Sequence, residues 1–427
     1  MRFHAPSSAA GHLSDHLKMA LSSVSSALRR TVHPWAWLVV GGGLALLVKL
    51  YLAFSTSGTT DVHFWRVYSL YLHGQGGMGL YHDVPVFNHP PFMVHALEAL
   101  TWITASTGLP FPFLLRLPGI LADTGSLVLL WRLFGGAGAS TSTHVALALF
   151  SVAPVSIMVS GFHGNTDSVM VFFLLLSVVL LEGRCRVWLA GAALGMSMNI
   201  KVWPVIFFPA IYAYIPDQRH RIACFSVAAG VFIVASLPYV IQDPALIADR
   251  VFRYGSLYGY WGLSRLAVWL RNDGPTLSGA AATYLRLAVP ILFGIIVLVS
   301  FKMDRLPTKP SLYTQCGVIA FMFMLLTPGF GVQYLAWLVP WVVGADPKVA
   351  LIFYVPSGLF LFFVYRSWVH GAHMGMPISG GDWGGGIRYL EVLCWISIGV
   401  TLLLLLRDAG LFKWPRAVPR KLKGSGR

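Results

Sequence analysis

The carboxylate of Asp61 is the strongest candidate for chemistry in this sequence. It follows the first strongly apolar run, at residues 35–54, in a chain with only 16 Asp and Glu residues among 427. A carboxylate where an apolar helix meets water loses solvation unless it has a partner or a function. The residues from Asp61 to Tyr68 predict a short helix that presents Asp61 as a general base, with Trp65 and Tyr68 at the membrane interface. In the alternative interpretation, Asp61 is only the N-cap of that helix.

Two further stretches carry residues suited to binding charge. Residues 161–168 include His163 and Asp167; such a stretch is a natural N-cap, but it could also face Asp61, and a helix N-terminus attracts anions. Lys201 lies between two apolar runs, where it is costly unless it meets a counter-charge or an anionic ligand. Snorkelling to the interface is the alternative for Lys201. Pro204 breaks the helix and favours a lysine that points into a polar pocket.

Arg116 and Asp123 lie two helical turns apart on one face, and ion pairing with neighbouring helices is preferred over a role in a site. His82, Asp83 and His89 could bind a metal, but their spacing matches no zinc pattern. A water-facing loop that positions the next helix is the preferred interpretation. The sequence therefore predicts no metal site and no cofactor.

A long connection at about residues 242–276 interleaves arginines with aromatic residues. Arg250 and Arg253 lie near Tyr254, Tyr258, Trp261 and Trp269. Cations beside aromatic rings suit a phosphate together with a sugar ring, or lipid headgroups. An ordinary belt at the membrane interface is the alternative.

The elements that must hold these residues are membrane helices. Hydrophobic residues make up 56% of the chain and charged residues 11%, and the mean hydropathy is +0.69. A soluble domain has about 25% charged residues, so lipid must cover this chain. The net charge of +15 arises from basic residues at the ends of apolar runs, which is the positive-inside pattern and does not imply nucleic acid. The four cysteines show no motif spacing.

The basic loops set the predicted topology of an all-α, polytopic membrane protein. About 10–12 transmembrane helices are expected, two of them, at 204–215 and 332–343, short enough to be broken helices that line a cavity. Segment 92–107 is predicted to be re-entrant or interfacial, since only an even number of crossings keeps Asp61 and His163 on one side. The predicted regions are a cytoplasmic segment at 1–33, one transmembrane domain at 34–407 with a first outer loop at about 55–113, and a basic cytoplasmic tail at 408–427.

A series of landmarks in order along residues 35–345 resembles the GT-C superfamily of membrane glycosyltransferases. The most similar branches are the bacterial family 87 type polyprenol-phosphate mannosyltransferases and the dolichyl-phosphate-glucose glucosyltransferases. The glucosyltransferases carry a His-Glu-Lys run where this chain has Gln333, Tyr334 and Leu335, so the bacterial branch is the closer match. The landmarks are Asp61; Leu80 and Tyr81 with residues 89–92; Arg116 with Asp123; residues 161–167; Lys201 and Pro209; Arg250 with Arg253; and residues 330–340.

The resemblance implies a GT-C-type helical bundle that performs an inverting transfer of a hexose, mannose or glucose. The donor would be a polyprenyl- or dolichyl-phosphate sugar, and the acceptor a lipid-linked molecule or a glycan. Asp61 would be the base, and a metal is not needed because Lys and Arg can meet the charge of a monophosphate. The implied contacts to the donor phosphate or substrate are His163, Asp167, Lys201, Arg250, Arg253, Gln333 and Tyr334, with His89, Arg116 and Asp123 as structural or possible site residues.

The resemblance also predicts a multi-pass protein of the plasma (inner) membrane, with membrane lipids as partners and the site on the extracytoplasmic side. Two alternatives remain open from the sequence: a polytopic transporter or lipid flippase, and a non-catalytic GT-C-like subunit. The sequence shows no inverted hydropathy repeat, and its long outer loops rich in arginine and aromatic residues favour lipid-sugar chemistry.

Overall fold

The computed structural model describes residues 34–184, 186–252, 261–265, 279–370 and 385–412. Within these ranges every regular element is a helix, and no strand is found. The elements are α2 (Pro34–Ser55), α3 (Thr60–Asp83), α4 (Phe92–Thr107), α5 (Phe111–Leu133), η1 (Gly136–Gly138), α6 (Thr141–Ser151), α7 (Pro154–Met158), η2 (Val159–His163), α8 (Asp167–Arg184), α9 (Val187–Ile200), η3 (Trp203–Phe207), α10 (Phe208–Tyr214), α11 (Gln218–Val240), α12 (Pro244–Phe252), α14 (Gly279–Asp304), α15 (Leu312–Leu326), η4 (Val332–Trp337), η5 (Val339–Val342), α16 (Pro347–His370) and α17 (Ile387–Asp408).

Seven helices in the described part of the chain are long and apolar enough to cross a bilayer. Four further apolar helices have 10–17 residues, which is shorter than the roughly 20 residues that a bilayer requires. The predicted all-α, polytopic membrane architecture is confirmed, and the expected count of about 10–12 spans is reached only when the four short helices are included. The long spans are Ala36–Ser55, Phe111–Leu133, Thr141–His163, Gln218–Val240, Leu287–Asp304, Pro347–Trp368 and Ile387–Asp408.

The two predicted short spans are broken helices. Residues 203–214 form the tight turn η3 followed by α10, and residues 332–342 form the consecutive turns η4 and η5. Prolines lie at the start of η3, α10 and η5, where a missing backbone N–H costs least. Because these segments are mostly buried, their irregular backbone packs against protein rather than lipid.

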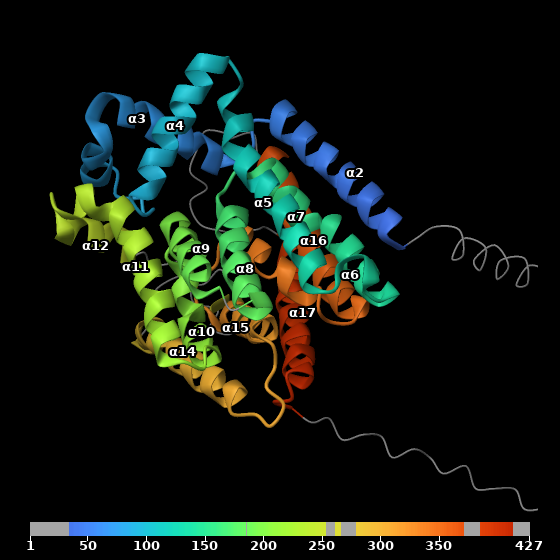
Figure 1. Cartoon of the computed structure of the whole chain (residues 1–427). Coiled ribbons are helices and arrows are strands. Elements are labelled where there is room, and N and C mark those ends of the chain that lie inside the picture. Colours follow the sequence, from blue (N-terminus) through green and yellow to red (C-terminus); the bar gives the residue numbers. More distant parts are fainter. Residues whose placement is uncertain (1–33, 185, 253–260, 266–278, 371–384, 413–427) are drawn as a thin grey trace, which may run out of the picture.

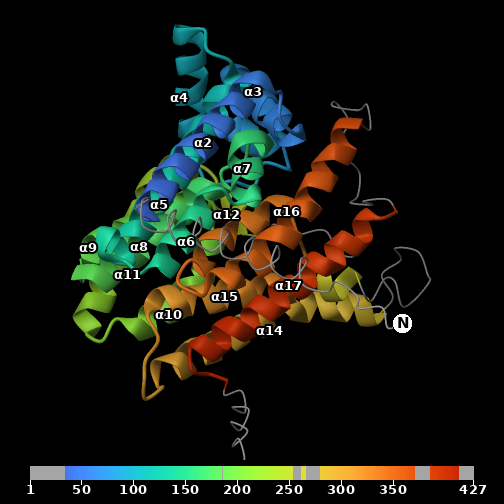
Figure 2. The same cartoon turned by 90° about the vertical axis from the view of Figure 1, so that its right-hand side faces the viewer.

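The helices α3 and α4 lie together at one end of the molecule, and the α14–α15 connection lies at the opposite end (Figures 1 and 2). The α14–α15 connection carries Arg305 and Lys309, two of the basic residues that the positive-inside pattern predicts to be cytoplasmic. The helix α4 has 16 residues, packs on α3 and is not among the candidate spans. This arrangement supports the prediction that segment 92–107 does not cross the membrane.

The helix α3 bends at Gly76, which has φ 70° and ψ 176° and so interrupts the helical backbone. The bend turns the second half of α3 so that the hydroxyl of Tyr81 donates to the carbonyl oxygen of His89 at 2.6 Å. Trp65 and Tyr68 were expected at the membrane interface, but this expectation is wrong because both side chains are buried. They pack edge-on against Phe87, with ring centroids 6.4 and 5.2 Å apart.

A buried ion pair joins three helices in the apolar core. The ammonium group of Lys49 in α2 lies 2.7 Å from Asp123 in α5 and donates to the hydroxyl oxygen of Ser156 in α7 at 2.7 Å. The ion pair predicted for Asp123 with a neighbouring helix is therefore confirmed. Arg116 differs, because its guanidinium donates to carbonyl oxygens at the end of α2, including Leu52 at 3.1 Å and Thr56 at 3.0 Å.

Candidate functional site

The N-terminus of α3 places Asp61. Thr59, which precedes the helix, is its N-cap, since its hydroxyl accepts from the backbone N–H of Asp61 at 3.3 Å. The alternative that Asp61 itself is the cap is therefore wrong. Because Asp61 does not cap the helix, its carboxylate can bind His163 and Asn165, and its side chain is 30% exposed.

A π-helical turn, η2, places His163. The turn ends at Gly164, whose φ of 83° favours glycine. A Cβ atom at Gly164 would lie only 2.2 Å from Cγ2 of Val62, so a larger residue would push α3 away. The hydroxyl of Thr59 also donates to the carbonyl oxygen of His163 at 2.8 Å, which fixes the start of α3 against this turn.

The imidazole of His163 lies between Asp61 and Tyr365. Its Nε2 is 3.0 Å from Oδ2 of Asp61, and its Nδ1 is 2.8 Å from the hydroxyl of Tyr365 in α16. An ionised carboxylate only accepts, so Nε2 carries the proton and donates to Asp61. In the neutral imidazole Nδ1 then accepts from the Tyr365 hydroxyl, which selects one tautomer and one ring orientation.

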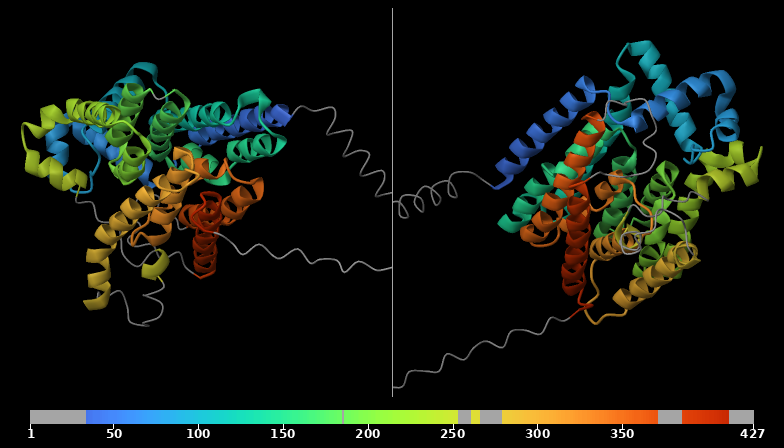
Figure 3. Two further views of the ribbon diagram at one scale, coloured as in Figure 1. Left: turned by 60° about the horizontal axis from the view of Figure 1, so that its bottom comes forward. Right: turned by 180° about the vertical axis from the view of Figure 1, so that it is seen from behind.

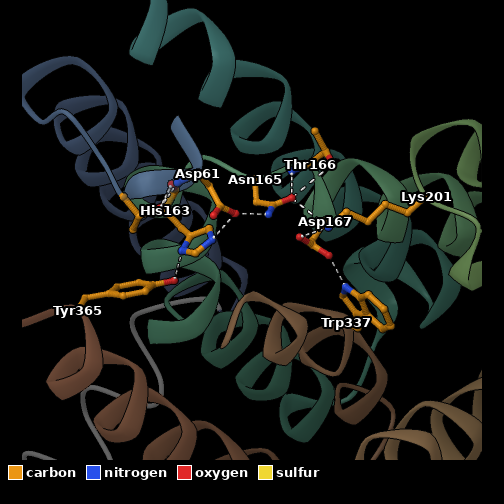
Figure 4. Close-up of polar contacts among 9 residues, drawn as sticks. Asp61, His163, Asn165, Thr166, Asp167, Lys201, Trp337 and Tyr365 are labelled. Carbon is orange, nitrogen blue, oxygen red and sulfur yellow. Dashed lines mark hydrogen bonds and ion pairs between the residues drawn. The ribbon is translucent and has the colours of Figure 1, made fainter. Parts of the chain in front are cut away.

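Asn165 connects the two halves of the site (Figure 4). Its Nδ2 donates to Oδ2 of Asp61 at 2.6 Å. Its Oδ1 accepts from the Lys201 ammonium at 3.0 Å and from the backbone N–H of Thr166 at 2.6 Å. One amide therefore touches both the carboxylate of α3 and the cation at the end of α9, and its orientation is set by both neighbours.

Lys201 forms an ion pair with buried Asp167. The Nζ–Oδ2 distance is 2.8 Å, and Oδ1 of Asp167 accepts from the indole N–H of Trp337 in η4 at 2.5 Å. Lys201 is the C-cap of α9, with φ −153° and ψ 145°, so the extended backbone before Pro204 aims the side chain inward. The predicted inward-pointing lysine is confirmed, and its counter-charge is Asp167.

Seven side chains thus form one hydrogen-bonded set, called here the Asp61 network. They come from α3, η2, the turn between η2 and α8, the start of α8, the end of α9, η4 and α16. His163, Asp167, Trp337 and Tyr365 are buried, whereas Asn165 and Lys201 are partly buried. The members are Asp61, His163, Asn165, Asp167, Lys201, Trp337 and Tyr365.

The environment of Asp61 keeps it ionised. Burial acts to raise the pKa of its carboxyl group, but the charge and hydrogen bond of His163, the charge of Lys201 and the hydrogen bond of Asn165 outweigh burial and lower the pKa below the usual value of 3.8. Oδ2 accepts the hydrogen bonds from His163 and Asn165, and no hydrogen bond to Oδ1 is found among the described residues. The exposed oxygen is therefore available to a ligand.

His89 lies beside the Asp61 network without joining it. Its ring lies 4.7 Å from that of Trp65, and its Nδ1 is buried without a hydrogen-bond partner in the described part of the protein. Burial and then the charge of Lys201 lower the pKa of His89 to about 3. The neutral imidazole of His89 borders the site, and its Nδ1 could accept or donate one hydrogen bond.

The structure does not bring all predicted residues to this network. Arg250 of α12 instead donates to the carbonyl oxygens of Tyr81 and His82 at 3.0 and 3.5 Å, so it fastens α12 beneath the end of α3 (Figure 3). Tyr334 lies near the network, with its ring 5.8 Å from the Lys201 ammonium. Gln333 is half-buried beside Tyr334. Arg253 lies outside the described residues.

Three members of the network were not predicted as site residues. Asn165 was visible in the sequence as part of a polar stretch and was interpreted as a cap. Trp337 lay inside a landmark without an assigned role. Tyr365 lies near the end of the long apolar helix α16, and nothing in its local sequence distinguishes it from a membrane-interface tyrosine.

The described residues contain no group of three or more His, Cys, Asp or Glu side chains that could hold a metal ion. Lys201 occupies the position between Asn165 and Asp167 where a cation would otherwise lie. The absence of a metal requirement stays a prediction.

The helical bundle and the Asp61 network together have the character of a polytopic membrane enzyme. A protein-family model described as Mannosyltransferase (PIG-M) matches residues 159–266, which include His163, Asn165, Asp167 and Lys201. The chain is also 28% identical over 102 residues to GPI mannosyltransferase 1 of Debaryomyces hansenii. This similarity covers 22% of the chain and 24% of the relative, so it spans about a quarter of the relative's length.

These two similarities confirm the resemblance to the GT-C superfamily of membrane glycosyltransferases. They point to the mannosyltransferase side of that superfamily rather than to the glucosyltransferases. The family match covers a part of the chain that carries four members of the Asp61 network, and it does not reach Asp61 itself.

Proposed function

We propose that this protein transfers mannose from a polyprenyl- or dolichyl-phosphate mannose to a hydroxyl group of a lipid-linked glycan. The mannosyltransferase similarities favour mannose over glucose. The name of the relative, a GPI mannosyltransferase, suggests a glycosylated phosphatidylinositol as the class of acceptor to test first. The reaction takes place at the extracytoplasmic face of the membrane that holds the protein.

Asp61 is the general base in this proposal. Its free oxygen accepts the proton of the acceptor hydroxyl as that oxygen attacks the anomeric carbon of the donor. The bond between the anomeric carbon and the phosphate oxygen breaks, and the electron pair leaves with the polyprenyl phosphate, so the configuration inverts. Since phosphate is a good leaving group, a carboxylate with a low pKa suffices to take the proton late in the step.

Lys201 is the proposed donor to the leaving phosphate. An ammonium group has three N–H donors, and the described contacts to Asn165 and Asp167 use two of them. The third can bind a phosphate oxygen. Because Asp167 already matches the charge of Lys201, a second cation is needed to balance the phosphate, and Arg253 is proposed for that role.

The observation that carries the proposal is the shared contact of Asn165 with Asp61 and Lys201. Asp61 acts on the hydroxyl group of the acceptor, and Lys201 binds the phosphate of the donor. Both groups react at the anomeric carbon, so the two side chains must be held at a fixed separation. The Asn165 amide supplies that fixed link with hydrogen bonds of 2.6 and 3.0 Å.

The test is a transfer assay on membranes that contain the protein. Radiolabelled polyprenyl-phosphate mannose is added with a glycosylated phosphatidylinositol, and lipids are separated by thin-layer chromatography. A new labelled glycolipid that depends on the protein supports the proposal. Movement of the intact donor across sealed vesicles without a new product would instead indicate a flippase.

A further inference from the structure

A second feature borders the Asp61 network: a cavity of about 280 Å³ enclosed by α3, α4, α5, α8 and α9. Its wall is almost entirely apolar, with Leu97 and Leu114 buried and Leu100 and Met196 half-buried. A cavity lined by such side chains excludes water and accepts hydrocarbon. The mechanism proposed above does not use it.

The cavity is accessible from the outer surface of the helical bundle. Leu115 of α5 and Phe173 of α8 line it while only half-buried, and Pro118 of α5 is exposed. The helix α5 is one of the long candidate spans, so the surface around Pro118 faces lipid. A hydrocarbon chain that enters here exchanges one apolar surrounding for another and loses no solvation.

The inner end of the cavity is polar and lies on the Asp61 side of the network. Asn165 and Thr166 line this end, and Asn165 donates to Asp61 at 2.6 Å. Trp65, one helical turn after Asp61 in α3, forms part of the same wall. Of the residues around Lys201, Asn165 and Ile200 line the cavity, whereas Asp167, which pairs with the cation, and Tyr334, whose ring lies near it, do not.

We infer that this cavity holds a hydrocarbon chain of the lipid-linked acceptor. A substrate anchored there presents its polar end at Asn165, beside the base that takes the acceptor proton. The phosphate of the donor belongs at Lys201, on the other side of Asn165. The inference rests on the proposed function and adds that the acceptor is recognised by its lipid part as well as by its glycan.

A larger apolar cavity of about 450 Å³ between α2, α5 and α6 does not share this property. Its charged residues are Lys49 and Asp123, which bind each other and Ser156 and not the Asp61 network. No described residue links that cavity to Asp61. The smaller cavity is therefore the one placed to serve the reaction.

The kinetic test fills the cavity. Ala96→Trp, on the α4 wall, places a large side chain into it, and Met196→Trp narrows it from α9. The control is Ala105→Trp, which is exposed on the opposite face of α4. Each variant is assayed in membranes with a glycosylated phosphatidylinositol and with the deacylated form of the same glycan.

Both cavity variants are expected to lower kcat/KM for the acylated acceptor at least tenfold more than for the deacylated one, while Ala105→Trp changes neither. Equal effects on the two acceptors, or no effect, would overturn the inference. Agreement between the α4 and α9 variants separates filling of the cavity from a local folding defect, which would lower activity with both acceptors alike.

A labelling experiment identifies the occupant without turnover. Phosphatidylinositol with a diazirine in one acyl chain is expected to label peptides of α4, α5 or α9, and Ala96→Trp is expected to reduce this labelling. If a diazirine-bearing polyprenyl phosphate labels these peptides instead, the cavity holds the donor chain and the inference is wrong. If no mannose is transferred to any acceptor, labelling still decides the occupant, so failure of the proposed function is distinguishable from failure of this inference.

Discussion

Asp61 and Lys201 bind the same side chain, Asn165, on its two opposite polar atoms. The ion pair of Lys201 is with Asp167, so Asp61 is stabilised directly by hydrogen bonds from an amide and an imidazole, and the charge of Lys201 acts on it without a direct bond. This keeps the Asp61 carboxylate ionised while its second oxygen stays available. Had Lys201 paired directly with Asp61, the basicity of the carboxylate would have been lower still.

His163→Ala is expected to move the acid limb of the pH–rate profile to higher pH. In the intact protein the pKa of the Asp61 carboxyl group is lowered below its usual value, so Asp61 stays ionised and kcat/KM falls only at a pH below the range of an ordinary carboxyl group. Without the charge and hydrogen bond of His163, burial raises the pKa of Asp61 and more of the carboxylate is protonated at a given pH. An unchanged acid limb, measured as kcat/KM from pH 4 to 8, would contradict this role of His163.

Tyr365→Phe should lower kcat by roughly tenfold with little change in stability, because it removes one hydrogen bond of about 1 kcal/mol that orients His163. The effect should fall on turnover and not on the KM for the donor, since Tyr365 touches neither substrate in the proposed geometry. Tyr354→Phe is the matched control, because that buried hydroxyl donates to the carbonyl oxygen of Val339 away from the network. A similar loss of kcat in both variants would indicate a general packing effect.

Lys201→Met is expected to be strongly destabilising. It leaves Asp167, which is fully buried, without its counter-charge, and breaking a buried pair costs about 3–5 kcal/mol. The double variant Lys201→Met with Asp167→Asn should recover much of that loss, since no buried charge is left unpaired. Thermal unfolding in detergent measures both effects, and additive losses in the double variant would show that the two residues do not interact. Transfer should remain impaired in the double variant because the Lys201 ammonium group, which is proposed to bind the leaving phosphate, is missing.

The pair of Lys49 and Asp123 is expected to be structural only. Lys49→Met should lower thermal stability, whereas Lys49→Met with Asp123→Leu should restore it, because an apolar pair of similar volume often replaces a buried ion pair without loss. In the restored double variant transfer should be close to that of the intact protein. A stable double variant without activity would mean that this ion pair takes part in the reaction.

Much of the fold was predictable because lipid imposes simple rules. Apolar length predicted the long spans, and Pro204 correctly predicted that α9 ends before Lys201. The burial of Trp65 was not predictable, since an aromatic residue beside a membrane helix suits either lipid or protein contact. It depends on Phe87, which only the bend at Gly76 and the following loop bring close.

The site was predictable in its residues but not in its connections. Asp61, His163 and Lys201 were conspicuous as polar groups at the ends of apolar runs. The contacts that join them come from Asn165 and Tyr365, whose roles depend on the π-helical turn before Gly164 and on the packing of α16. Arg116 was expected to form an ion pair with a neighbouring helix, but it donates to backbone carbonyl oxygens at the end of α2. No sequence pattern predicts such bonds to the backbone.

The most direct test of the central claim is the rate of mannose transfer by Asp61→Asn. The change preserves shape and removes the negative charge, so donor binding and thermal stability should persist while transfer falls at least about 100-fold. Asp83→Asn, at the exposed other end of α3, is the matched control and should transfer mannose at the rate of the unaltered protein. If Asp61→Asn forms product as fast as Asp83→Asn, Asp61 is not the base and the account fails.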